Sequence, residues 1–239
     1  MKAGPALCDF FAGVHLYGGI VTALLDRERT GRGRTVEVAM LDAVYASLSS
    51  QLGMCYGQGW QEADRTGNRH GGLAESPYNV YPTSDGYIAI ICVGEQHWKN
   101  LLDAMQRPEL NADPRFGSLK TRVEHMDIID TLVSGFTRQY NKQDLFALLM
   151  KHRVPCAPVR TLMEVVNDPH LHQRGMLQWI DHPEHGRIVV QSSPMRYDGA
   201  PPLPHQPSER LGANNEAVLT GWLGLSKSQV DQLSRDGVT

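Results

Sequence analysis

The stretch Thr-Gly-Arg-Gly-Arg-Thr-Val-Glu-Val-Ala-Met-Leu-Asp, residues 30 to 42, joins three predicted elements and decides the fold class. The pair Gly31 and Gly33 ends a helix, because glycine is a common helix terminator. Residues 34–39 alternate polar and apolar side chains, a pattern typical of a β-strand. A second helix is predicted over residues 40–52. The order helix, strand, helix is typical of a layer in a doubly wound α/β protein.

The helix before this stretch is predicted over residues 13–29, with Asp9 at its N-cap. An N-cap carboxylate accepts hydrogen bonds from the free N–H groups of the first turn, and the helix dipole stabilises its charge. Apolar residues recur along the helix at roughly helical spacing. They are Val14, Leu16, Ile20, Val21, Leu24 and Leu25.

A β-hairpin is predicted further along the chain, with strands at 78–81 and 87–92 and a turn at Asp85-Gly86. Helices are predicted near 95–105, 119–139 and 142–152, the last capped by Asn141. Two prolines restrict residues 154–159 to an extended or edge segment, because proline lacks an N–H donor. The hairpin and its helices therefore predict a small α+β domain over residues 75–165.

The C-terminal third is predicted to contain shorter elements. Extended runs lie at 176–180 and 187–190, and the proline-rich stretch 194–207 is a surface connection. Two short helices follow, one near 213–222 and one from an N-cap at Ser226 to Gly237.

Composition excludes several classes of protein. A chain of 239 residues with 41% hydrophobic and 21% charged residues is typical of a globular protein with one or two domains. Its net charge of −3 gives no positive field for nucleic acid or an anionic membrane surface. The first residues do not resemble a secretory signal, and no stretch approaches the roughly 18 apolar residues of a membrane span. We therefore predict a cytoplasmic protein without nucleic-acid or membrane partners.

The cysteines and histidines predict neither a disulfide framework nor a metal site. The cysteines are far apart, form no CxxC pair and are typical of buried free thiols in a reducing compartment. The histidines lack the spacing of a zinc motif and are interpreted as surface residues. The residues concerned are Cys8, Cys55, Cys92 and Cys156, with His170, His172, His182 and His185.

Three groups of motifs, taken together in their order and spacing, resemble family III coenzyme A (CoA) transferases, the formyl-CoA and carnitine-CoA transferase type. The resemblance runs over essentially the whole chain from about residue 5. The first group is 7–13, 19–24, 30–33 and 36–42; the second is Gly67-Asn-Arg-His70 with 76–78 and 83–86; the third is 154–159, 167–169, 211–212 and 223–226.

The resemblance implies a fold in which a Rossmann-like large domain and a small domain belong to two interlocked subunits. In this family the large domain begins well upstream, so its N-terminal portion, with most CoA contacts, is expected to be missing here. The implied division is a large-domain segment at 1–60, a linker at 61–74, the small α+β domain at 75–165, and a return linker with a C-terminal large-domain segment at 166–239. The expected partner is a second copy, with the N-terminal half either upstream or on a separate chain.

The resemblance also implies a catalytic role for Asp9, which matches the family's catalytic aspartate. A carboxylate nucleophile moves CoA through a mixed anhydride and an aspartyl-CoA thioester, without handing the acyl group to water. Acyl-CoA and a carboxylic acid are then the substrates, and no permanently bound cofactor is implied. From the residues alone, Asp9 could equally be a simple helix cap.

Four further residues are candidates for substrate binding. Glu95 matches an active-site glutamate of related racemases, or is a first-turn acid that complements the helix dipole. Gly71 and Gly72 match a longer glycine-rich loop that closes over the intermediate in some relatives, or form a linker turn. Met40 matches a residue near the nucleotide in some relatives, or fills the core.

Two other functions remain open at the level of sequence. The chain could be an α-methylacyl-CoA racemase or epimerase, in which Asp9 is one member of an acid/base pair and the other is an upstream histidine. It could also be a non-catalytic or incomplete subunit that needs an N-terminal partner chain. The second alternative predicts a chain that aggregates or associates, because half a sheet leaves apolar edges exposed.

Overall fold

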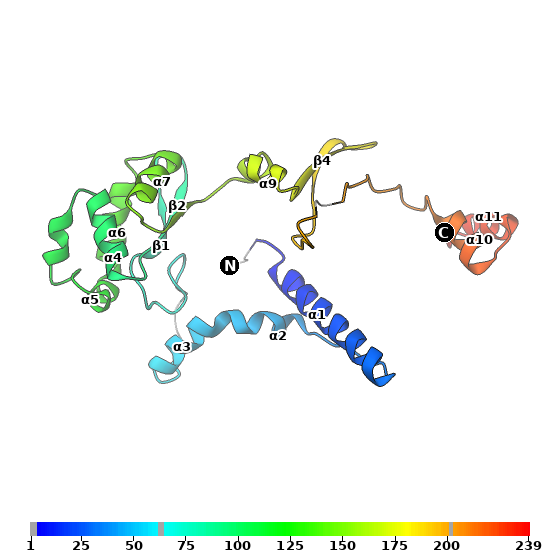
Figure 1. Ribbon diagram of the computed structural model, residues 1–239, viewed down its shortest axis with the longest axis horizontal. Helices are drawn as coiled ribbons and strands as arrows, with labels where there is room; N and C mark the ends of the chain where they lie inside the picture. The colour runs from blue at the N-terminus through cyan, green and yellow to red at the C-terminus, as the bar shows by residue number, and fades with distance from the viewer. Residues whose placement is uncertain (1–3, 62–64, 201–202) are drawn as a thin grey trace. The chain divides into compact units, whose positions relative to one another are not determined.

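A computed structural model describes residues 4–61, 65–200 and 203–239 of the chain. Residues 1–3, 62–64 of the predicted linker and 201–202 of the proline-rich stretch lie outside the described residues. The fold is mixed α/β, in two compact units that divide after Val159 (Figure 1). The described sheets are both antiparallel, with strand order β1-β2-β3 in one and β4-β5 in the other. The Rossmann-like part of the expected fold therefore stays a prediction.

The first helix, α1, spans Leu7–Thr30 and ends at Gly31, whose φ of 70° is left-handed. The N–H of Gly31 donates to the carbonyl of Arg27 at 2.8 Å, as in a glycine C-cap. The N-cap is Ala6, so the prediction that Asp9 caps the helix is wrong. Asp9 is the third helical residue, and an acid is favourable at both positions, so the sequence does not separate them.

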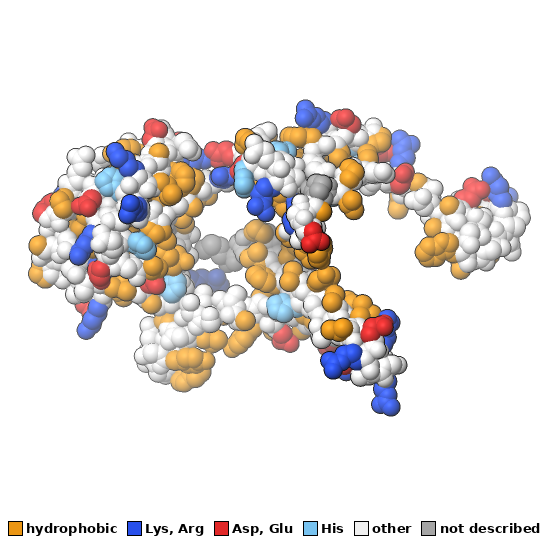
Figure 2. Space-filling view, viewed as in Figure 1, with side chains coloured by type: hydrophobic (Ala, Val, Ile, Leu, Met, Phe, Trp, Pro, Cys, Tyr) orange, Lys and Arg blue, Asp and Glu red, His pale blue; other side chains and the backbone are white. Residues whose placement is uncertain are grey.

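The apolar side chains of α1 are largely exposed, and Ala12 is its buried residue. An 18-residue window of α1 has a mean hydropathy of 1.4 and is 6% buried, so the helix is long and apolar enough to cross a membrane by length and composition alone. The expectation that no stretch approaches that length was therefore wrong. Figure 2 shows hydrophobic atoms along the helix. A long apolar helix with exposed side chains is also found in globular proteins, where the helix packs against a surface that lies outside the described residues.

The segment after α1 is extended but forms no strand. A strand needs a neighbour to pair with, and no described segment pairs with residues 34–39, so the strand prediction is not met. The helix predicted next is present as α2 (Met40–Tyr45), the 3₁₀ turn η1 (Ala46–Leu48) and α3 (Ser49–Gly57). The helical stretch thus runs five residues beyond the predicted end at 52.

The predicted hairpin is confirmed. Strand β1 (Tyr78–Pro82) pairs antiparallel with β2 (Tyr87–Ile91), and the N–H of Thr83 donates to the carbonyl of Gly86 at 2.9 Å across the turn. The short strand β3 (Cys156–Pro158) adds to the other edge of β2. The proline-flanked segment is therefore an edge strand, where a missing N–H is tolerated.

Helices pack against the hairpin. They are α4 (Glu95–Ala104), the 3₁₀ turn η2 (Pro108–Ala112), α5 (Leu119–Glu124), α6 (Met126–Thr137) and α7 (Lys142–Lys151) (Figure 1). The helix predicted over 119–139 is two helices, because His125, with φ −118° and ψ 30°, interrupts it. Asn141 caps α7 as predicted, and its side chain accepts from the N–H of Asp144.

One hydrophobic core lies inside this part of the chain, residues 78–159, which we call the hairpin domain. Its fully buried side chains come from β2, α4, α6 and α7 and include Ile88, Trp98, Leu101, Val133, Leu145 and Leu149. A core of this kind supplies most of the hydrophobic stabilisation of a small domain.

The second unit contains short elements, of which the two strands and the last two helices follow the predicted order and the first two helices were not predicted. They are α8 (Leu162–Val166), α9 (Pro169–Gln173), β4 (Leu177–His182), β5 (Gly186–Gln191), α10 (Asn215–Leu223) and α11 (Lys227–Arg235), the last capped by Ser226. Strands β4 and β5 form a hairpin. His182 is buried and its ring lies 3.2 Å from the hydroxyl of Ser208, so it is not the surface histidine that was predicted.

Shortening a core leucine tests where the stability resides. We expect Leu149→Ala to lower the free energy of unfolding of the hairpin domain by about 2–5 kcal/mol, because it removes a fully buried side chain and leaves a cavity. Leu211→Ala is the control, because Leu211 is fully exposed. Urea denaturation followed by circular dichroism measures both, and equal shifts for the two variants would contradict this location of the core.

Candidate functional site

Asp9 lies on the first turn of α1 with its side chain accessible to solvent. A pocket of about 470 Å³ lies beside it, between the first turn of α1 and the segment formed by α2 and η1. The residues that line it are Gly4, Pro5, Ala6, Leu7, Cys8, Asp9, Phe11, Val44 and Ser47. A ligand in this pocket can therefore reach the carboxylate of Asp9. Of the four thiols expected to be buried, Cys92 is buried, Cys55 and Cys156 are partly buried, and Cys8 is exposed, so the expectation was wrong for Cys8.

The position at a helix N-terminus affects the chemistry of Asp9. The N-cap Ala6 makes no side-chain hydrogen bond, and the first intrahelical bond at this end runs from the N–H of Phe10 to the carbonyl of Ala6 at 3.2 Å. N–H groups of a first turn have no intrahelical partner and carry partial positive charge. They can stabilise an oxyanion that develops next to them.

The structure does not bring the other sequence candidates to this pocket. Met40 is the first residue of α2 and is half exposed, and the pocket is lined by Val44 and Ser47 from further along that helical stretch. Its exposure also excludes core filling by Met40 within the described residues. No described contact joins Asp9 with Glu95, Gly71 or Gly72.

The two glycines lie against the first turn of α3. A Cβ on Gly71 would come within 2.3 Å of Nε2 of Gln51, and one on Gly72 within 2.9 Å of the carbonyl oxygen of Ser50. Glycine at both positions therefore allows a close approach of backbone to helix.

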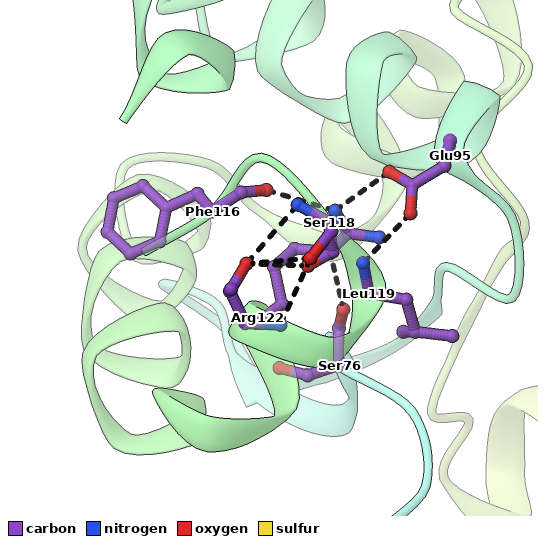
Figure 3. Close-up of polar contacts among 7 residues, drawn as sticks. Ser76, Glu95, Phe116, Ser118, Leu119 and Arg122 are labelled. Carbon is purple, nitrogen blue, oxygen red and sulfur yellow. Dashed lines mark hydrogen bonds and ion pairs between the residues drawn. The ribbon is translucent and has the colours of Figure 1, made fainter. Parts of the chain in front are cut away.

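Glu95 begins α4 and has both carboxylate oxygens engaged (Figure 3). One oxygen lies 2.9 Å from Nη1 of Arg122, and the other accepts from the N–H of Leu119 at 2.8 Å. The hydrogen bond from Arg122 lowers the pKa of Glu95 below its ordinary range, and the bond from Leu119 acts in the same direction against desolvation. The carboxylate of Glu95 is therefore held in its ionised form, in which it balances the positive charge of Arg122.

Arg122 was not singled out from the sequence. Its side chain has no exposure to solvent, and it donates to the carbonyls of Ser76 at 3.1 Å and Phe116 at 3.0 Å (Figure 3). Its guanidinium carbon lies 5.2 Å from the ring centre of Trp98. Nη2 of Arg122 and the hydroxyl of Ser76 are buried without a hydrogen-bond partner among the described residues. An arginine four residues after the capping serine of α5 gives no signal of burial in the sequence.

Metal ligands do not gather in the parts of the chain that the structure describes. No group of three or more histidine, cysteine, aspartate or glutamate side chains is placed to hold an ion there.

Comparison with known proteins agrees with this mixed α/β fold. The family model described as CoA-transferase family III matches residues 1–215. The chain belongs to this family.

The chain covers only part of the length of its individual relatives. The chain is 34% identical to the succinyl-CoA:mesaconate CoA-transferase of Haloarcula hispanica, over 85% of this chain and 50% of that protein. It is 30% identical to the formyl-CoA:oxalate CoA-transferase of Streptomyces coelicolor, over 100% of this chain and 61% of that protein. A crystal structure of a CAIB/BAIF family protein from Brucella suis matches with a TM-score of 0.73 and 30% identity, over 92% of this chain and 56% of that one. The chain spans about half the length of the curated relatives it matches.

Removing the charge of Glu95 tests its role as the counter-ion of Arg122. We expect Glu95→Gln to destabilise the hairpin domain by about 1–2 kcal/mol near neutral pH, in the lower part of the range for charged partners because Glu95 is half exposed. Since its folded pKa is lowered, the contribution of Glu95 is present above about pH 4.3 and lost as the pH falls through the folded pKa.

The measurement is the unfolding midpoint of wild type and variant as a function of pH. The two curves should separate at neutral pH and converge in acid. Glu109→Gln is the matched control, because Glu109 pairs with Arg107 on the surface and its loss should leave the midpoint nearly unchanged. A constant gap between wild type and Glu95→Gln at every pH would contradict the counter-ion role.

Proposed function

We propose that the protein acts as a CoA-transferase that moves CoA between carboxylic acids, with Asp9 as the nucleophile. The observation that carries the proposal is the exposed carboxylate on the first turn of α1, beside a pocket and inside the segment that matches the family. A nucleophile must be accessible to its substrate, and a helix N-terminus stabilises the anions of acyl transfer.

The first half of the reaction loads CoA onto the protein. The carboxylate of Asp9 attacks the carbonyl carbon of an acyl-CoA, a C–O bond forms and the C–S bond breaks, which gives a mixed anhydride and the CoA thiolate. The thiolate then attacks the aspartyl carbonyl and expels the donor acid as its carboxylate. Asp9 is left as an aspartyl-CoA thioester.

The second half reverses these steps with another acid. The acceptor carboxylate attacks the aspartyl carbonyl and expels the thiolate, which forms a second mixed anhydride. The thiolate attacks the acyl carbonyl of the acceptor, and the carboxylate of Asp9 is released. No proton is gained or lost in the cycle, so Asp9 needs no general base.

The substrate class follows from the relatives. One is named for succinyl-CoA and mesaconate, the other for formyl-CoA and oxalate. Both acceptor acids are dicarboxylic. These names support a short acyl-CoA as the donor and a small dicarboxylic acid as the acceptor.

A complete site also requires a surface that covers α1. This helix carries Asp9 and leaves most of its apolar side chains exposed in the described residues. An interlocked homodimer together with the N-terminal half of the family fold, upstream or on a separate chain, would bury that surface and exclude water from the anhydride. The exposure of α1 is also what favours the alternative of a subunit that is inactive without its partner.

The racemase alternative is less well supported. In the sequence it was favoured by Glu95, but both oxygens of that side chain are engaged by Arg122 and Leu119. A carboxylate that neutralises a buried arginine is a poor candidate for direct work on a substrate.

Trapping the thioester tests the proposal. The purified protein is incubated with succinyl-CoA or formyl-CoA in heavy water, treated with borohydride and digested for peptide mass analysis. We expect reduction of Asp9 to the corresponding alcohol, because borohydride reduces a thioester and leaves a free carboxylate unchanged. We expect Asp9→Ala to lower the exchange rate by at least about 10³-fold, the order for loss of a nucleophile.

Asp42→Asn is the matched control, because Asp42 is another exposed acid on the first turn of a helix, α2. It should retain both trapping and exchange. With succinyl-CoA, deuterium at the α-carbon of the acyl group and an unmodified Asp9 would support the racemase instead. The third outcome is neither a reduced Asp9 nor a deuterated substrate with the chain alone. If the same sample exchanges CoA once a complementary N-terminal half is added, the chain is an incomplete subunit.

A further inference from the structure

We propose that residues 66–73 form a fixed brace between α3 and the hairpin domain, anchored by Arg69, rather than a lid that opens and closes. The brace is a property of the fold and does not depend on the proposed function. It assigns a role to Arg69, which lies between the connecting segment and α6.

The anchor is a pair of charge-assisted contacts on α6. Nε of Arg69 donates to Asp130 at 2.7 Å, and its Nη2 donates to Asp127 at 2.6 Å. The Asp127 side chain is 92% exposed, whereas that of Asp130 is 17% exposed, so Asp130 is the stronger partner. The hydrogen bond to Asp127 and the contacts with Asp130 raise the pKa of Arg69 against the effect of burial.

Asp130 also holds the first strand of the hairpin. It accepts from the side-chain amide of Asn79 at 3.0 Å and from the hydroxyl of Tyr81 at 2.7 Å. Burial, with the charge of Asp130, raises the pKa of Tyr81, so its hydroxyl stays protonated and donates. One carboxylate thus ties α6, β1 and the connecting segment together, and loss of Arg69 would release only the segment.

The segment itself is folded into turns. The N–H of Arg69 donates to the carbonyl of Thr66 at 3.2 Å, and that of Leu73 to the carbonyl of His70 at 2.9 Å. The ring of His70 stacks on Tyr78 with 5.1 Å between centres and 28° between planes. These contacts fix the backbone on either side of Arg69.

The other end of the brace is a close approach to α3. A side chain on Gly72 would meet the backbone carbonyl of Ser50 at 2.9 Å, and a main-chain atom of a helix cannot move aside cheaply. At Gly71 the obstacle is the exposed side chain of Gln51, which can rotate away. Gly72 is therefore the position that requires glycine.

Fixation at both ends argues against the lid role that the resemblance implies for Gly71 and Gly72. A lid needs weak contacts that open locally at low cost. Under the proposed function, protection of the anhydride from water then comes from the surface that covers α1. The brace and the proposed CoA-transferase function can be disproved independently of each other, because the test of the brace uses no substrate.

Hydrogen exchange followed by mass spectrometry tests the brace in the purified protein. In the wild-type protein, some backbone N–H groups of residues 66–73 donate hydrogen bonds within turns. We expect these N–H groups to exchange much more slowly than unprotected amides. Arg69→Gln and Gly72→Ala should each speed their exchange by about tenfold or more, while exchange in β2 and α4 stays the same. Arg69→Lys should recover part of the protection, because lysine keeps the charge without the two-pronged geometry.

Two variants serve as controls. Arg138→Gln removes an exposed positive charge from the same groove on α6, and Gly53→Ala adds a methyl group to α3 where no atom lies within 4 Å. Both should leave exchange in 66–73 unchanged. Unprotected exchange of the segment in wild type, or equal protection in wild type and Arg69→Gln, would overturn the brace. A uniform increase across the hairpin domain would also overturn it, because it would show general destabilisation.

Discussion

The apolar surface of α1 is the constraint on which the remaining interpretation depends. This helix carries Asp9, yet only 6% of its most apolar window is buried in the described residues. Exposed apolar area of this extent costs free energy in water, so we propose that another surface covers it when the protein works. The same covering would close the pocket beside Asp9 and keep water from an acyl intermediate.

The hairpin domain differs from α1, because its apolar side chains and its buried charge find their partners within the domain. Its core is fully buried, and the buried charge of Arg122 is compensated by Glu95 and by two carbonyl groups. These partners come from α4 and from the segments before β1 and α5, so one guanidinium holds three parts of the domain in place. The Arg69 network then connects this stable part to α3, and through α2 to the helix that carries Asp9.

Local signals in the sequence predicted the local structure. The Asp85-Gly86 turn, the Asn141 and Ser226 caps and the proline-flanked edge strand were all found, since each depends on a few neighbouring residues. The strand at 34–39 was not, because pairing requires a partner from elsewhere. The Arg122 and Arg69 contacts join residues that are far apart in the chain, since Arg69 and Asp130 are 61 positions apart, and an arginine in isolation gives no sign of burial. Asp9 was singled out through motif context, which the family match supports.

Hydrogen exchange of the α1 amides as a function of protein concentration tests the central claim most directly. The account predicts weak protection of residues 10–30 in dilute protein, and protection that rises as the chain associates or meets a complementary N-terminal half, while the hairpin domain stays protected throughout. Strong protection of α1 in a dilute monomer, equal to that of the hairpin domain, would contradict the account.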